Sequence, residues 1–160
     1  MSSLSIESVN DGKGGLTVKL AGQVDELADY GTIKTTGVKR VAFDFEKIKL
    51  INSTGLQRWI QFLNSIDKGV AIAFVRCSIR VITQINMFPG FLGGRQVAIE
   101  SFFAPYFCEA CDASRDLLLD ASQQFASGKP PAAPKMKCPT CAGPAEFDGI
   151  EKKYFMFLKS

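Results

Sequence analysis

The chain has 160 residues, of which 46% are apolar and 22% charged, a composition typical of a globular protein rather than a disordered one. It contains no histidine, which excludes a Ser–His or Cys–His nucleophile pair and a histidine-ligated metal. The net charge is only +3, and residues 101–160 carry seven basic and seven acidic residues, so this tail is a poor nucleic-acid binder on charge alone.

The first ten residues lack the basic and apolar regions of a secretory signal. The longest clean apolar run, residues 70–75, is far too short to span a bilayer. Five cysteines in a chain without such a signal favour metal binding over disulfides. We therefore expect a cytoplasmic protein with no membrane span.

Five segments have the alternating or continuous apolar pattern of a β-strand: residues 4–9, 16–22, 40–45, 69–75 and 96–103. Turn residues at 11–15 join the first two segments in a hairpin. Residues 23–30 allow at most a brief helix. Apolar residues at helical spacing predict one helix from Ser53 and a second around residues 79–85.

This order of elements predicts an α/β domain with parallel crossovers over residues 1–100. The stretch "MFPGFLGG", residues 87–94, ends the second helix. It is either a tight turn with Phe88 and Phe91 tucked into the core, which we favour slightly, or an exposed apolar contact patch. We expect Cys77 to be a small buried residue rather than a reactive thiol.

The junction "INSTG" lies between a strand-like run and a helix-like run. Asn52 or Ser53 is a good N-cap, because its side-chain oxygen can accept a free backbone N–H of the helix. A helix N-terminus also tolerates and attracts phosphate. Gly55 keeps side-chain bulk away, so Ser53 could be phosphorylated without melting the helix, and the added charge of about −1.5 to −2 would mostly change the surface.

The segment "VAFDFEKIKLINSTGLQRWIQFL" resembles the centre of the STAS domain, the fold of anti-sigma factor antagonists. In that family a strand ending in Asp is followed by a short apolar stretch and an Asp-Ser-Ser/Thr-Gly turn that opens a helix. Asp44 matches the strand-end Asp, and residues 52–55 match the turn. Upstream, "LAGQVD" makes Asp25 the matching acid. The resemblance covers about residues 4–100 and implies a mixed β-sheet with helices packed on it.

The resemblance implies a partner switch. The unphosphorylated domain binds an anti-sigma factor or a related serine kinase-like regulator, which phosphorylates the serine matching Ser53, and the phosphate abolishes binding. The docking surface would comprise Asp25, Asn52, Ser53, Thr54 and Gly55. Asn52 replaces the usual Asp, which keeps the capping geometry but loses a charge. Ser53 is therefore either the phosphoacceptor or purely a helix cap.

Two C-x-x-C pairs, separated by 26 residues, carry the strongest chemical signal: Cys108, Cys111, Cys138 and Cys141. Two such loops supply the four soft ligands of a tetrahedral Zn²⁺ site, and "CPTCAG" resembles the knuckle of zinc ribbons. A closed four-thiolate site is structural rather than catalytic. A redox dithiol and a pair of disulfides are the alternatives, and rubredoxin-like iron also fits the spacing.

We therefore expect residues 101–160 to form a small β-rich zinc-ribbon module stabilised by one structural zinc ion. A Pro/Gly/Ala-rich stretch at 127–135 resembles a linker loop. Aromatic residues in the closing apolar segment, 152–158, should pack the ribbon onto itself or onto the first domain.

These observations favour a regulatory protein-binding module over an enzyme, because no credible active site is present. The alternative is a STAS scaffold or sensory-complex component that is not phosphorylated. The expected partner is a protein, with no direct contact to nucleic acid, and the sequence leaves a homodimer open.

Overall fold

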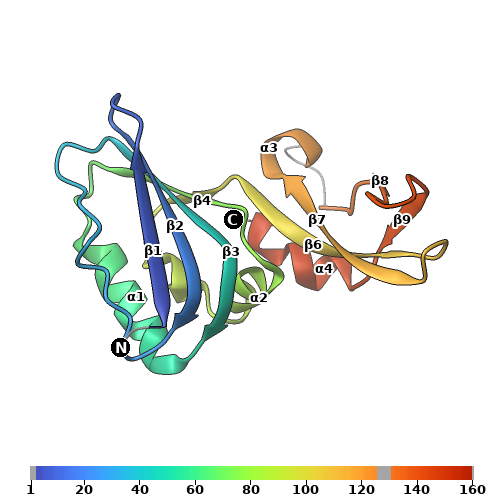
Figure 1. The fold of residues 1–160 in the computed structure, drawn as a ribbon, viewed down its shortest axis with the longest axis horizontal. Helices are drawn as coiled ribbons and strands as arrows, with labels where there is room; N and C mark the ends of the chain where they lie inside the picture. Colours follow the sequence, from blue (N-terminus) through green and yellow to red (C-terminus); the bar gives the residue numbers. More distant parts are fainter. Residues whose placement is uncertain (1–2, 126–130, 160) are drawn as a thin grey trace.

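The computed structural model describes residues 3–125 and 131–159. Its first sheet has five strands in the order β1-β2-β3-β4-β5 (Figure 1). β1 and β2 pair antiparallel, as the predicted hairpin requires, and the other neighbours pair parallel. The strands span Leu4–Asn10, Gly15–Val24, Arg40–Ile51, Ala71–Val75 and Val97–Ile99.

Both predicted helices are confirmed: α1 spans Ser53–Ser65 and α2 spans Ile79–Met87, followed by the 3-10 helix η1, Pro89–Leu92. Strands β3, β4 and β5 are joined by these helices as parallel crossovers. The core between sheet and helices is aromatic. Rings that contact one another there come from both layers: Phe43, Phe45, Trp59, Phe74 and Phe91.

A second, smaller sheet has the order β7-β6-β9-β8. Its strands are β6 Ser101–Cys108, β7 Ala113–Asp120, β8 Met136–Lys137 and β9 Pro144–Phe147. Three short helical segments accompany it: α3 Ala121–Gln124, α4 Glu151–Tyr154 and the 3-10 helix η2, Phe155–Lys159. The prediction of an α/β fold with a mixed sheet and a small β-rich module is thus confirmed.

The two sheets share one continuous buried core. The small sheet and α4 lie beside α2, where the amide of Asn86 donates to the backbone oxygen of Tyr154 at 2.9 Å. Phe102 of β6 packs against Phe155 and Phe157. The closing aromatic segment therefore packs both onto the small sheet and onto α2, so the part after residue 100 covers a face of the part before it.

Two local predictions are wrong. The strand at 40–45 continues to Ile51, because β3 keeps pairing with β2 through two register shifts, and Asp44 therefore lies within the strand rather than near its end. The strand at 96–103 is two strands, β5 and β6, in different sheets: at Glu100 the backbone N–H donates to Phe74 and the carbonyl accepts from Ala121, which separates the sheets.

Residues 25–39 contain no helix. Two Asx turns take its place, with Asp25 Oδ1 accepting from Leu27 N–H at 3.0 Å and Asp29 Oδ1 accepting from Gly31 N–H at 2.9 Å. Such local side-chain acceptors compete with helical hydrogen bonds. Of the predicted linker at 127–135, residues 126–130 lie outside the described residues.

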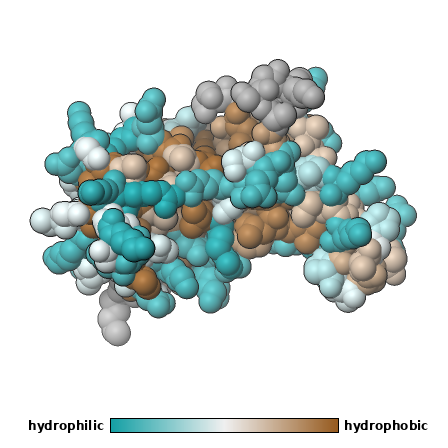
Figure 2. All heavy atoms as spheres, turned by 90° about the horizontal axis from the view of Figure 1, so that it is seen from above, coloured by the Kyte–Doolittle hydropathy of each residue, from teal (hydrophilic) through white to brown (hydrophobic). Residues whose placement is uncertain are grey.

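The face in Figure 2 shows apolar side chains in patches interrupted by polar ones. Among the described residues, Met87 is 76% exposed and Phe88 45%, whereas Phe91 is buried. The turn prediction for 87–94 thus holds for Phe91 and fails for Phe88. No helix in the described part of the chain is long and apolar enough to cross a membrane.

Candidate functional site

The N-cap of α1 is Asn52. Its Oδ1 accepts the backbone N–H of Gly55 at 2.7 Å, and its own backbone N–H donates to the carbonyl of Val24 at 3.1 Å. The first bond satisfies one of the free N–H groups of the helix, and the second attaches the cap to the end of β2. The capping prediction is confirmed at Asn52.

Gly55 lies against the backbone of β2. A Cβ atom at this position would stand 1.9 Å from the carbonyl oxygen of Val24 and 2.6 Å from the backbone nitrogen of Asp25. Glycine is required here because the first turn of the helix rests on the chain just before the β2–β3 loop. The sequence suggested only that Gly55 keeps side-chain bulk away from the helix end. The structure shows that any side chain at this position would clash with the backbone of β2.

The structure brings all five residues of the predicted docking surface together at this junction. Ser53 and Thr54 are exposed on the first turn of α1, Asn52 is half-buried and Gly55 is buried. Asp25 is only 8% exposed, and its carboxylate closes the turn that starts the β2–β3 loop. The surface presented to solvent is therefore the pair of hydroxyl residues.

Two residues that sequence reasoning missed tie the β2–β3 loop to α1. The amide of Asn52 donates to the carboxylate of Glu26 at 3.0 Å, and this bond holds the pKa of Glu26 below its usual value. Arg58 Nε donates to the carbonyl of Ala28 at 3.0 Å. An acidic group thus lies beside the turn despite the Asn at position 52. No local signal could reveal this, because the partners are 26 and 30 residues apart.

Behind this loop, Tyr30 is buried against α1. Its ring stacks on Phe62, with centroids 4.8 Å apart, and meets the edge of Trp59. Burial raises the pKa of the phenol above its usual value. The loop that carries Asp25 and Glu26 is therefore anchored to the aromatic core.

The four late cysteines form one cluster. Their sulfur atoms all lie within 4.8 Å of one another. Cys108 and Cys141 are 3.5 Å apart at sulfur, and Cys111 and Cys138 are 3.9 Å apart. Zn–S bonds of about 2.3 Å in a tetrahedron place sulfurs about 3.8 Å apart, so the donor set fits such an ion. All four are free thiols, and they could bind a metal ion.

The two loops are built alike. Each second cysteine is followed by a residue with positive φ, Asp112 at 51° and Ala142 at 60°. In the second loop, Ala142 N–H donates to the Cys138 carbonyl at 2.8 Å, and Gly143 N–H points to Cys141 Sγ at 3.4 Å. In this loop, a small residue after the second cysteine thus directs a backbone amide at sulfur.

The pKa values of the thiols differ within the cluster. Backbone N–H groups of Cys141 and Thr140 lower the pKa of Cys138 to about 6, with help from Arg115. Hydrogen bonds to Cys141 and Cys108 raise the pKa of Cys111 to about 12. The surroundings therefore favour the thiolate at Cys138 and the protonated thiol at Cys111, and a bound cation would displace the remaining protons.

Cys77 is completely buried, and burial raises the pKa of its thiol well above the usual value. The prediction of a small buried residue is confirmed. A thiol held protonated and away from solvent is a poor nucleophile.

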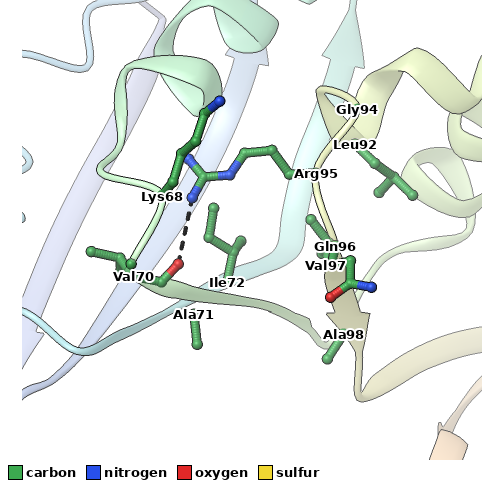
Figure 3. Close-up of a pocket in the computed structure, with 11 residues that line it drawn as sticks. Lys68, Val70, Ala71, Ile72, Leu92, Gly94, Arg95, Gln96, Val97 and Ala98 are labelled. Atoms are coloured by element: carbon green, nitrogen blue, oxygen red, sulfur yellow. Dashed lines mark hydrogen bonds between the residues drawn. The ribbon is translucent and has the colours of Figure 1, made fainter.

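A cavity of about 1050 Å³ opens between the N-terminal ends of β4 and β5 (Figure 3). The residues that line it include two cations, Lys68 and Arg95, and no carboxylate. The Arg95 guanidinium is already used, because it donates to carbonyls at the end of α1, among them Ile66 at 2.6 Å and Leu63 at 2.9 Å. The cavity thus lacks an acid–base pair.

No protein-family model matches the chain, and no curated protein sequence matches it significantly.

Proposed function

We propose that the protein is a regulatory binding module whose docking surface is the Asn52–Gly55 turn with the adjoining Asp25, and that phosphorylation of Ser53 switches the partner off. The single observation that carries the proposal is that Ser53 is exposed at the first position of α1. The helix end is held firmly, because the cap Asn52 bonds to Val24 and Gly55 packs against the backbone of β2. A rigid scaffold that presents exposed hydroxyl groups suits a binding switch.

Charge explains how such a switch would work. A phosphate on Ser53 would add about −1.5 to −2 charges close to the Glu26 carboxylate that Asn52 holds. The helix N-terminus tolerates that charge, so the fold would persist while the surface changes from weakly to strongly acidic. A partner that docks on neutral hydroxyl groups and the exposed Leu27 would then be repelled.

The proposed partner is a protein of the anti-sigma factor or serine kinase-like class, and the proposed setting is the cytoplasm, where thiols stay reduced. We propose zinc as the metal of the cysteine cluster, with a structural role, because four thiolates close its coordination shell. The same lack of an open position, together with the absence of histidine, supports a non-enzymatic protein.

The second candidate is a scaffold that is not phosphorylated. The Asn52–Glu26 hydrogen bond favours it, because the polar groups of the turn are then used to hold the β2–β3 loop in place. In this case Ser53 is only an exposed residue next to the cap.

Affinity capture from native lysate separates the two. The wild-type chain should retain an ATP-binding kinase-type regulator that transfers phosphate to Ser53, and Ser53→Asp should lose it. Ser65→Asp, at the other end of the same helix, is the matched control and should keep the partner. If wild type and Ser53→Asp retain the same non-kinase proteins, the switch is rejected in favour of the scaffold.

A further inference from the structure

We propose that Arg115 is a positioning residue of the metal centre: its guanidinium donates to the cysteine thiolates and offsets their negative charge. The inference rests on the proposal that the four cysteines hold a metal. It concerns a residue outside the C-x-x-C motifs.

Strand register brings Arg115 to the cluster. In the β6–β7 hairpin, Cys108 is paired with Ala113 and Tyr106 with Arg115. Side chains two residues apart on a strand share a face, and paired residues point the same way. Arg115 therefore projects from the same face of the hairpin as Cys108.

The guanidinium has no competing partner among the described residues. Its Nε is buried, and no hydrogen bond satisfies it there. The strand register places it on the face that carries Cys108, and electrostatic interaction with the sulfurs of Cys138 and Cys111, one from each knuckle, supports the same placement. A buried N–H without an acceptor is costly, and a metal-bound thiolate is an acceptor with negative charge. Arg115 is thus placed to donate to the sulfurs of the site.

The charge of the site makes this contact significant. Four thiolates and one divalent ion leave a formal charge of about −2. Two other cations close in sequence to the cysteines, Lys135 and Lys137, are exposed, where solvent and salt screen their effect. Arg115 is half-buried and is screened less. Outer-shell hydrogen-bond partners of this kind typically change metal affinity by about 10- to 100-fold.

Zinc affinity, measured on the full chain by competition with a chromophoric chelator, tests the proposal. Arg115→Gln should bind zinc about tenfold or more weakly than wild type. Lys137→Gln, which removes a neighbouring exposed charge, should bind as wild type does. Equal affinity of Arg115→Gln and wild type would overturn the inference. If wild type itself binds no zinc, the metal proposal has failed instead, so the two failures are distinguishable.

A measurement on the unaltered chain keeps the proposal falsifiable if Arg115→Gln does not fold. In the ¹⁵N spectrum of the ¹¹³Cd-loaded protein, the Nε–H of Arg115 should be protected from solvent exchange and coupled to cadmium. The exposed Arg80 provides the comparison and should exchange fast. An Arg115 Nε–H that exchanges as fast as that of Arg80 contradicts the proposal.

Discussion

A Cβ atom added to Gly55 would lie 1.9 Å from the carbonyl oxygen of Val24, so the first turn of α1 packs directly against the last residue of β2. This contact places the Ser53 turn and Asp25 on one surface. It also makes the geometry of the candidate docking site depend on a packing constraint rather than on loop conformation.

Gly55→Ala should therefore destabilise the protein by about 3 kcal/mol, the upper range for overpacking, because a rigid carbonyl cannot move aside as a side chain can. Urea unfolding measures the effect. Gly69→Ala is the control, since its added Cβ meets only the carboxylate oxygen of Asp67 at 3.2 Å. Equal midpoints for the two variants would show that the helix end can shift away from β2.

Asn52→Ala should raise the pKa of Glu26 back toward its usual value, because the amide that stabilises the carboxylate is lost. A folded pKa below the unfolded one means that this bond contributes stability above the usual carboxyl pKa and loses it as pH falls through the folded pKa. Carboxyl ¹³C titration by NMR measures the shift. Ser53→Ala should leave Glu26 unchanged, and an identical titration in Asn52→Ala and wild type would contradict the expectation.

Ser53→Asp should leave the fold intact. Its free energy of unfolding should equal that of wild type or exceed it by up to about 0.5 kcal/mol, because a negative charge interacts favourably with a helix N-terminus. Ser65→Asp, in the last turn of the same helix, should lose about 0.5 kcal/mol because the dipole there is reversed. Thermal unfolding at low salt compares them. A larger loss for Ser53→Asp than for Ser65→Asp would mean that Glu26 repulsion outweighs the helix dipole.

Metal removal should loosen α2 as well as the small sheet. Metal bound only to the folded state stabilises it by about 4 kcal/mol when the free ion exceeds its Kd a thousandfold. The part after residue 100 is attached to α2 by the Asn86–Tyr154 hydrogen bond, and Phe102 of the small sheet belongs to the same buried core as Val81, Ile82 and Ile85 of α2. Amide hydrogen exchange with and without a chelator should show faster exchange in both regions. If metal removal makes exchange faster only within residues 101–159, the parts of the chain before and after residue 100 unfold independently.

Much of the fold follows from local pattern. The helices at Ser53 and Ile79 were predictable because each presents one apolar face at helical spacing, and the hairpin because turn residues separate two alternating runs. The strand switch at Glu100 was missed because residues 96–103 were interpreted as one strand, although the polar pair Glu100 and Ser101 interrupts the apolar residues there. The two halves of this segment pair in different sheets, β5 with β4 and β6 with β7, and the backbone of Glu100 bonds to Phe74 and Ala121, both more than twenty residues away.

The sequence by itself determined which four cysteines could hold a metal ion and the capped turn at Asn52, because ligand spacing and capping depend on residues a few positions apart. Only the tertiary structure decided that Glu26 supplies an acid beside that turn, that Gly55 is required by Val24, and that Arg115 faces the cysteines. Each of these contacts joins segments whose register is set by strand pairing and core packing, which no local pattern specifies.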